Sequence, residues 1–576
     1  MRRFRGIGAS AGFAIGPALV YRPRTLPIDR QVIDAQDIAG ELARWQEARA
    51  KAQSQLAEIQ ARAEQAVGKD NATIFAAHGL MLEDPALLEF VERKICDEHL
   101  PAPAALSAAA DFYAGVLAAL PGECWQARAA DVHDVAQRVL RLLLGIEDAS
   151  LAALTRPAII VAEDLTPSDT AVMNREFTLG FCTAGGGMTA HTAILARANG
   201  WPAVVGMGQA WAEIMDGEAL IVDGGAGLVI ASPEEATIGE YRNRQLAWRQ
   251  ACALAQSEAC QPAVTLDGRR CEVVANIGDV ASAQAALALG AEGVGLLRTE
   301  FLFLDRTTAP DEDEQYRVYR AIADVLEQRP LIVRTLDVGG DKPPPYLDLA
   351  PEANPFLGWR GLRISLAQPE LLKTQLRAIL RAGVGRQVKV MFPMVASVEE
   401  VRAVKRLLDE AREELRRRGL PFAEEMAVGI MVEVPAAAVA ADLLAPEVDF
   451  FSLGTNDLTQ YTLVVDRSNA RVAPLYDPLH PAVLRLIKLV IEAGHRAGKW
   501  VGMCGEMAGD LEAIPLLVGL GLDEFSMNAP AIPAAKSLIR RLDGRAMSEL
   551  VARALQMTTT DEIRALGRGE AFARQQ

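Results

Sequence analysis

The second half of the chain alternates short strand-like runs with helical segments, and this alternation constrains the fold more than any other feature. Eight apolar, β-rich runs can be counted within residues 261–576. Helical segments, among them residues 398–418 and 481–497, fall between these runs. Such a pattern over a segment of this length predicts an α/β fold with a closed parallel (β/α)8 barrel. The eight runs are residues 273–277, 293–297, 331–336, 388–394, 428–434, 450–453, 500–504 and 524–527.

Residues 27–145 have a different composition, dominated by Ala, Leu, Gln, Glu and Arg, which are strong helix formers. Trp45, Ala52 and Ile59 repeat every seven residues, which predicts a long helix with one apolar stripe packed against further helices. We therefore expect a helical bundle here. A bundle of this kind is more often a binding module than a catalytic one.

The flanking segments are typical of a compact α/β unit. Short apolar runs at residues 158–162, 203–206 and 219–222 are separated by glycine turns, and similar short strands open the chain. We expect residues 1–26 and 146–232 to form one α/β domain, with the helical bundle as an insertion. Residues 233–260 are rich in Glu, Arg and Gln and predict a helical linker to the barrel.

Charge and cysteine usage exclude several classes of function. The chain has 59 Lys and Arg against 75 Asp and Glu, a net charge of −16. A surface this acidic repels phosphate backbones and anionic lipid, so we expect no nucleic-acid partner and no membrane insertion. It suits a partner with a basic patch. The seven cysteines contain no C-x-x-C pair, which argues against a disulfide framework and favours the reducing cytoplasm.

Polar residues gather where the predicted barrel strands end. Barrel enzymes carry their chemistry at the carboxyl ends of the strands, because the loops that follow converge on that rim. Five strand ends here contribute arginines, carboxylates, an amide and a thiol, which predicts a functional site. The residues are Arg298, Glu300, Arg334, Asp337, Glu433, Asn456, Asp457, Cys504 and Glu506.

These residue types indicate a small anion and a metal ion. Guanidinium groups match carboxylate and phosphate oxygens two at a time. The carboxylates of Glu433 and Asp457 would repel such an anion unless a cation lies between them, so we predict a Mg²⁺ site. Cys504 is open to two interpretations from the sequence alone, a space-filling core residue or a reactive thiol.

His191 stands in a glycine-rich loop, residues 185–193, that runs into a short predicted helix ending at Gly200. Backbone N–H groups in such a loop and at the start of a helix suit a transiently bound phosphate. The pattern alone leaves two interpretations, a buried structural histidine or a phosphate-handling one.

Longer motifs surround these residues. The loop belongs to GGGMTAHTAILAR (185–197), and the sixth strand begins FFSLGTNDLTQYTLVVDRSN (450–469). Five more motifs follow the same family order: GVGLLRTEFLF (293–303), VRTLDVGGDK (333–342), NPFLGWRGLR (354–363), MVEVPAA (431–437) and MCGEMAGD (503–510). Together they resemble enzyme I of the phosphoenolpyruvate:sugar phosphotransferase system over nearly the whole chain.

The resemblance implies an architecture and partners. Enzyme I has a swivelling phosphohistidine domain, interrupted by a helical domain that docks the carrier protein HPr, and a phosphoenolpyruvate-binding barrel at residues 261–576 that forms a homodimer. The family transfers a phosphoryl group from phosphoenolpyruvate to itself and then to HPr, as the first step of sugar uptake in the cytoplasm.

The resemblance also implies roles for single residues. His191 accepts the phosphoryl group, and Thr170 orients it. Glu433 and Asp457 hold Mg²⁺. Cys504 protonates the enolate that becomes pyruvate. The residues expected to bind or line the phosphoenolpyruvate site are Arg298, Arg334, Lys342, Arg360, Asn456, Asp457 and Arg467.

Three positions depart from the usual enzyme I pattern. Met188 stands where an arginine is common, Ala184 where an aspartate is common, and Ala11 where a proline is common. The loop sequence is similar to that of pyruvate phosphate dikinase, so a dikinase or phosphoenolpyruvate synthase-like phosphotransferase is one alternative. That alternative requires an ATP-binding domain, for which no glycine-rich nucleotide loop is visible. The second alternative is an inactive carrier-binding regulatory scaffold, which would be expected to lose its rim charges.

Overall fold

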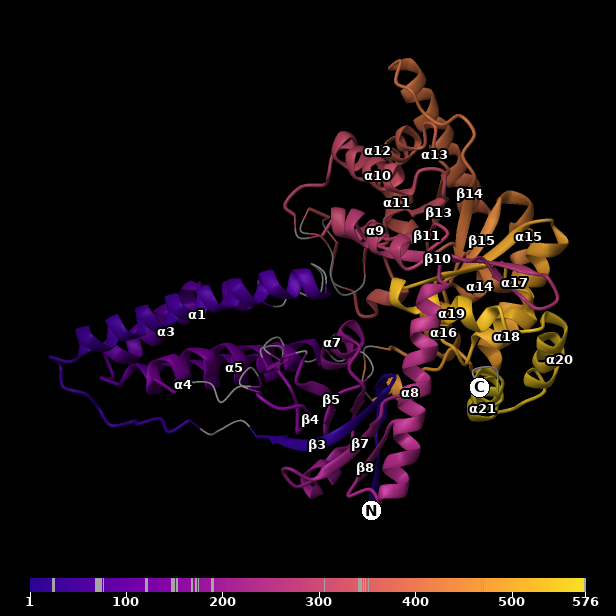
Figure 1. The fold of residues 1–576 in the computed structure, drawn as a ribbon. Coiled ribbons are helices and arrows are strands. Elements are labelled where there is room, and N and C mark those ends of the chain that lie inside the picture. Colours follow the sequence, from indigo (N-terminus) through magenta and orange to yellow (C-terminus); the bar gives the residue numbers. More distant parts are fainter. Residues whose placement is uncertain are drawn as a thin grey trace. The chain divides into compact units, whose positions relative to one another are not determined.

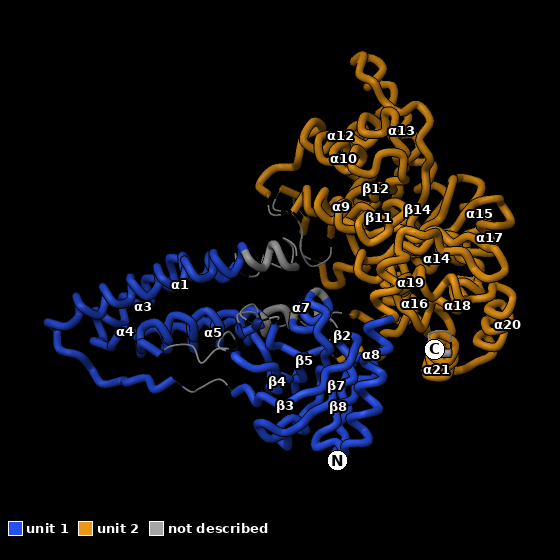
Figure 2. The backbone as a smooth tube through the Cα atoms, viewed as in Figure 1, with its two compact units in different colours: residues 1–250 blue, residues 251–576 orange. Residues whose placement is uncertain are grey.

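The computed structural model describes most of the chain, which forms two compact units, residues 1–250 and 251–576 (Figures 1 and 2). None of the described helices is long and apolar enough to cross a membrane. The residues outside the described part are 23–25, 68–74, 76, 120–122, 147–150, 152–153, 167–168, 171–172, 175, 188–190, 305, 340–343, 345, 348, 351, 468, 470 and 574–576.

The first unit contains a mixed sheet of eight strands. They are β1 (Arg2–Arg5), β2 (Ile7–Ser10), β3 (Phe13–Tyr21), β4 (Ala158–Ala162), β5 (Thr178–Thr183), β6 (Ala203–Val205), β7 (Ala219–Asp223) and β8 (Leu228–Ala231). Their order is β1-β8-β7-β3-β4-β5-β6-β2, with β3 to β6 parallel. Helix α7 (His191–Asn199) follows β5, so the glycine-rich loop lies beyond the carboxyl end of a parallel strand.

A separate helical core lies between β3 and β4 in the chain order. Trp45, Ala52 and Ile59 are all buried in it, which confirms the predicted apolar stripe on α1. Its helices are α1 (Ile38–Val67), α3 (Pro85–Cys96), α4 (Ala102–Ala119) and α5 (Glu123–Leu144). They extend to one side of the sheet in Figure 1. Outside this bundle, α8 (Glu235–Ser257) follows β8.

The second unit is a closed barrel of eight parallel strands, as the sequence predicts. Each strand pairs with its successor, and β10 pairs with both β11 and β17 to close the ring. The short strand β9 (Ala263–Val264) pairs antiparallel with β10 outside the ring. The barrel strands are β10 (Arg270–Ile277), β11 (Val294–Leu297), β12 (Leu331–Arg334), β13 (Val388–Phe392), β14 (Val428–Val432), β15 (Phe450–Leu453), β16 (Trp500–Met503) and β17 (Glu524–Met527).

Helices cover the outside of the barrel. In α13, a capping box formed by Ser397 and Glu400 starts the helix, and a row of apolar residues beginning at Val401 is buried against the strands. The helices are α9 (Val280–Ala288), α10 (Glu312–Leu326), α11 (Leu362–Ala367), α12 (Pro369–Ala382), α13 (Val398–Arg417), α14 (Pro435–Val439), α15 (Ala441–Leu444), α16 (Thr455–Leu463), α17 (Pro481–Arg496), α18 (Ile514–Leu520), α19 (Ile532–Ile539), α20 (Gly544–Ala554) and α21 (Thr560–Ala573).

Four barrel strands end earlier than predicted, at Arg334, Phe392, Val432 and Met503, and two of these differences have a clear physical reason. The prediction of 388–394 is wrong at its end, because Met394 has a φ of 56°, which a strand cannot accommodate. The prediction of 428–434 is also too long, because Pro435 starts α14 and leaves Val434 as its N-cap. Each shortened strand releases its last residues to the rim.

The inside of the barrel is filled by side chains. Apolar residues from neighbouring strands form one buried cluster, and Cys504 belongs to it. A filled interior leaves the carboxyl-end rim as the place where a small ligand binds. The other members of the cluster are Leu296, Ile332, Met391, Met431 and Phe450, with Trp500 packed against them.

Candidate active site on the barrel rim

Arg334, at the end of β12, is tied to two carboxylates from the rim. Its Nη2 donates to Glu300 Oε1 at 2.9 Å, and its Nη1 lies 3.4 Å from Asp337 Oδ2. The Asp337 N–H donates to the same Glu300 oxygen at 3.2 Å. Burial disfavours the guanidinium charge, but Glu300, Asp337 and Glu433 outweigh it, so the pKa of Arg334 lies above its ordinary value.

Arg360 bridges two aspartates and is only 7% exposed. Its Nε and Nη2 each lie 3.1 Å from an oxygen of Asp337, and Nη2 also lies 3.0 Å from Asp457 Oδ2. Its Nη1 donates to the Tyr461 hydroxyl at 3.0 Å. Asp337 thus contacts both Arg334 and Arg360, and Arg360 links Asp337, which follows β12, to Asp457 near the start of α16.

Glu433 and Asp457 form a buried carboxylate pair, 1% and 6% exposed. Burial, together with repulsion from Asp457 and Asp337, raises the pKa of Glu433 to about 8. The pKa of Asp457 is lowered despite its burial, because Arg360 and Arg467 favour its charged form. The Met394 N–H donates to Glu433 Oε1 at 2.7 Å, which fixes one side of the carboxylate.

This pair fits a divalent cation that takes only part of its shell from protein. Among the described residues, no group of three or more His, Cys, Asp and Glu side chains could hold a metal. Mg²⁺ commonly uses one or two carboxylates and completes its octahedron with substrate oxygens and water. Gly454 packs closely against this pair, since a Cβ there would lie 2.9 Å from Glu433 Cβ and 3.0 Å from Glu433 Oε2. Two buried carboxyl groups that interact electrostatically are a donor set that fits such a cation.

Cys504 lies at the end of β16 and is 5% exposed. Its N–H donates to Leu453 O at 3.0 Å, and the Asn276 amide donates to its carbonyl at 2.9 Å. Burial raises the pKa of the thiol to about 11, so the sulfur keeps its proton at neutral pH. Both interpretations of this cysteine are therefore compatible with its surroundings: it fills space in the barrel core and it carries a proton at the rim.

The other rim residues are held less tightly. Arg298 follows β11 with an exposed side chain. Arg467 is 39% exposed at its side chain and lies 3.6 Å from Asp457. The Asn456 side chain accepts a hydrogen bond from the Glu506 N–H at 3.0 Å, and the Tyr476 hydroxyl donates to the Asn456 carbonyl at 3.2 Å. Exposed arginines at the edge suit a ligand that enters from solvent.

His191 is the first residue of α7 in the first unit, directly after the glycine-rich loop. The helix ends before Gly200, whose φ of 69° stops it, so the predicted short helix is confirmed, whereas residues 188–190 of the predicted loop lie outside the described residues. The Thr170 hydroxyl donates to Thr166 O at 3.2 Å. Met188 and Lys342 lie outside the described residues.

The sequence predicts no role for several rim side chains. Glu300 and Asp337 can be found in it only by their positions at strand ends. No sequence pattern predicts a role for Tyr461 or Tyr476, because each contributes a hydroxyl that forms hydrogen bonds with residues distant in sequence.

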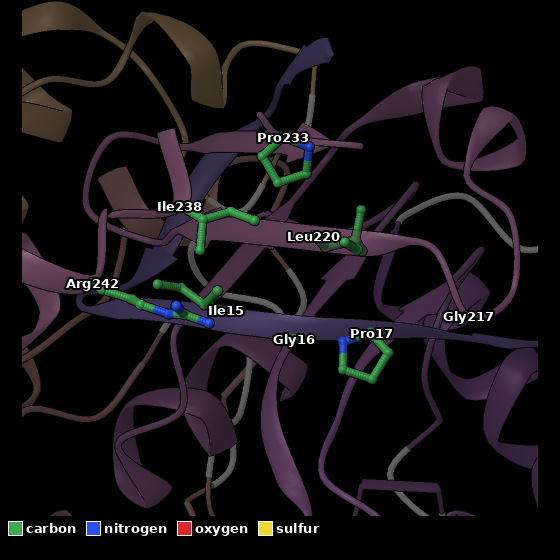
Figure 3. A pocket seen from close by; sticks show the side chains of 9 residues that line it. Ile15, Gly16, Pro17, Gly217, Leu220, Pro233, Ile238 and Arg242 are labelled. Carbon is green, nitrogen blue, oxygen red and sulfur yellow. The ribbon is translucent and has the colours of Figure 1, made fainter. Parts of the chain in front are cut away.

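The first unit also has a shallow surface pocket of about 300 Å³ (Figure 3). Arg242 is the one charged residue in its lining, which contains no nucleophile or acid. Its chemistry does not match that of the rim. The lining residues are Ile15, Gly16, Pro17, Gly217, Ala219, Leu220, Pro233, Ile238 and Arg242.

Known proteins resemble this chain over nearly its whole length. Three family models of PEP-utilising enzymes match it: the PEP-binding domain at residues 253–544, the N-terminal domain at 5–128 and the mobile domain at 154–227. A phosphoenolpyruvate-protein phosphotransferase of Geobacillus stearothermophilus is 46% identical over 562 residues, 98% of this chain and 97% of its own. That of Bacillus subtilis (strain 168) is 46% identical over 563 residues, 98% of each chain.

A solution NMR structure of an enzyme I protein is 37% identical and covers 43% of this chain and 99% of its own, with a TM-score of 0.38. The full-length relatives and the family models agree with the motifs and with the barrel that carries the rim. The chain belongs to the family of phosphoenolpyruvate-protein phosphotransferases, enzyme I of the phosphotransferase system.

Proposed function

We propose that the chain transfers the phosphoryl group of phosphoenolpyruvate to His191, releases pyruvate, and passes the group to a histidine of the carrier protein HPr. This is the first step of sugar uptake by the phosphotransferase system. The observation that carries the proposal is the buried rim on which Arg334 and Arg360 face Glu433 and Asp457. It stands in a chain whose full-length relatives are named for this reaction.

The rim suits a small, multiply charged anion. Arg334 and Arg360 are pre-oriented by carboxylates, whereas Arg298 and Arg467 have exposed side chains that can close on a ligand. Asn456 adds a neutral amide for the carboxylate end of phosphoenolpyruvate. Glu433 and Asp457 would hold Mg²⁺. When bound, the ion and the arginines together would neutralise the negative charge of the phosphoryl group.

The bond changes balance with the residues present. A neutral ring nitrogen of His191 attacks phosphorus, a nitrogen–phosphorus bond forms, and the bond to the enolate oxygen breaks. The enolate then takes the Cys504 proton at C3 and becomes pyruvate. A thiol with its pKa raised to about 11 is protonated at neutral pH, as a general acid must be. Solvent returns the proton to the sulfur.

The first unit supplies the acceptor and the carrier site. We assign residues 1–26 and 146–232 to the phosphohistidine domain and residues 27–145 to HPr docking. On α4, Phe112 and Val116 are 52% and 48% exposed, and the Phe112 ring stacks on Phe90 of α3. Such exposed apolar side chains suit a protein partner better than solvent. The net charge of −16 favours a carrier with a basic face.

The barrel supplies a surface for a second copy of the chain. Val439 of α14 and Leu443 of α15 are 64% and 63% exposed, one helical turn apart in sequence. We assign residues 261–576 to phosphoenolpyruvate binding and homodimerisation, residues 233–260 to a helical linker, and the whole protein to the cytoplasm.

Relatives of matching length named phosphoenolpyruvate-protein phosphotransferase support this function over a dikinase. The filled rim supports it over an inactive scaffold, since the arginines, carboxylates and thiol are all present. Met188 and Ala184 show that the arginine and aspartate usual in the histidine loop are not part of this chain's chemistry.

The assignment of His191 as acceptor predicts that His191→Ala abolishes uptake of label from phosphoenolpyruvate but leaves phosphoenolpyruvate binding intact, because the rim lies in the other unit. Label on the chain and binding by calorimetry are the two measurements. His133→Ala, an exposed histidine of α5, is the control and should label normally. In the wild type the label should pass to HPr. Labelled His191→Ala would mean that another residue is the acceptor.

The role of Cys504 predicts that Cys504→Ala lowers pyruvate turnover by ~10²-fold or more, the usual scale for loss of a general acid. Phosphoryl transfer to His191 should persist in a single turnover. Pyruvate made in D₂O should lose stereochemical preference at its methyl group, since solvent then protonates either face. Cys271→Ala, which removes a buried barrel cysteine away from the rim, should keep turnover. Normal turnover in both variants would return Cys504 to a packing role.

The close approach of Gly454 to Glu433 predicts that Gly454→Ala raises the Mg²⁺ concentration needed for half-maximal activity by ~10-fold or more, because the added methyl group would lie 2.9 Å from Glu433 Cβ and displace this proposed metal ligand. Gly569→Ala adds a methyl group where nothing lies within 4 Å and is the matched control. Titration of the self-phosphorylation rate with Mg²⁺ measures both. An unchanged requirement in Gly454→Ala would place the metal elsewhere.

A further inference from the structure

We propose that Thr299 and Gln375 are positioning residues that lock the two arginine-bearing loops of the rim together. The loops are the residues that follow β11, with Arg298, and those that end and follow β12, with Arg334. The inference rests on the proposed function, because it concerns how the phosphoenolpyruvate-binding arginines are held. Neither residue reaches the rim surface: Thr299 and Gln375 are each 1% exposed.

Thr299 joins the first loop to the second directly. It stands between Arg298 and Glu300, and its hydroxyl donates to the Arg334 carbonyl at 2.9 Å. The bond therefore runs from the neighbour of one arginine to the backbone of the other. This hydrogen bond limits how far the Cα atoms of Thr299 and Arg334 can move apart.

Gln375 reaches the same point from α12 outside the barrel. Its Oε1 accepts from the Leu336 N–H at 2.9 Å, and its Nε2 donates to the Thr299 hydroxyl at 3.2 Å. The second Nε2 hydrogen goes to the Tyr319 hydroxyl of α10 at 3.1 Å. One amide thus holds both loops and anchors them to two helices.

Glu300 makes a second connection between the loops on the side of the rim. Its carboxylate accepts from Arg334 Nη2 and from the Asp337 N–H. Successive residues, Thr299 and Glu300, therefore connect the same two loops from opposite sides. The ion pair between Glu300 and Arg334 can rearrange when an anionic ligand competes for Arg334. The hydrogen bond from Thr299 to the Arg334 carbonyl is neutral and buried, so water does not replace it.

The chemistry of the pocket favours positioning over simple filling. A buried amide or hydroxyl costs free energy unless its partners are present, and apolar residues would fill the same space without that requirement. Here the amide is fully used, with both donors and the acceptor engaged. Directional bonds fix the spacing of groups, and misplacement of a binding group by about 1 Å can cost ~10²-fold in rate.

The test is Thr299→Val in the full-length chain, which keeps the shape and removes the hydroxyl. We expect its KM for phosphoenolpyruvate, and its dissociation constant measured by calorimetry with Mg²⁺, to rise ~10-fold or more, with a smaller fall in kcat. Thr299→Ser restores the hydroxyl and should return both constants to near wild type. Gln375→Met, of similar volume, should resemble Thr299→Val.

Thr265→Val is the matched control for lost stability. It removes a buried threonine hydroxyl that contacts Asp267 and Arg269, before the start of β10 and outside the network of Thr299 and Gln375. It should lower the melting temperature and leave KM unchanged. Wild-type affinity in both Thr299→Val and Gln375→Met would overturn the proposal, and so would an equal rise in Thr265→Val.

Failure of the proposed function gives a different result. If the wild type binds phosphoenolpyruvate but forms no pyruvate, the proposed reaction is wrong, while the ratio of dissociation constants still decides the role of Thr299. If the wild type binds no phosphoenolpyruvate, both proposals fall.

Discussion

The burial of both Glu433 and Asp457 is the constraint on which the rest of the rim depends. Burial, with repulsion from Asp457 and Asp337, raises the pKa of Glu433 to about 8. Arg360 compensates Asp457 directly, and Asp337 holds Arg360 in place. The negative charge that remains on the buried carboxylates favours a divalent cation. That cation in turn compensates the charge of the carboxylates, so that an anionic ligand can bind among them.

The fold delivers this arrangement because strand ends in a parallel barrel converge. Arg334, Glu433 and Cys504 stand at or just after the ends of β12, β14 and β16, alternate strands of the ring. A filled interior beneath them supports the site and excludes water. The proposed acceptor, His191, belongs to another unit with its own sheet, so the acceptor and the rim are built independently.

The sequence predicts the barrel well because each parallel strand is a short apolar run between polar loops, and it predicts the strand-end residues for the same reason. The sequence misplaces the end of β13, because no residue next to Met394 predicts its positive φ. The Glu433 carboxylate that accepts the Met394 N–H follows another strand, β14. The sequence pattern does not predict that Gln375 is buried, since a glutamine on an amphipathic helix is normally a surface residue. Only the packing of α12 on the strand ends shows that it is a buried connector.

The most direct test of the account is whether phosphoenolpyruvate binding depends on the cation that the buried carboxylates require. The His191→Ala chain, which should bind without turnover, is titrated with phosphoenolpyruvate by calorimetry, once with saturating Mg²⁺ and once with EDTA. We predict a dissociation constant at least ~100-fold weaker without Mg²⁺, because no cation then offsets the negative charge of the ligand against the charged carboxylate of Asp457. Equal affinity under both conditions would contradict the account, since the carboxylate pair would then have no part in holding the substrate.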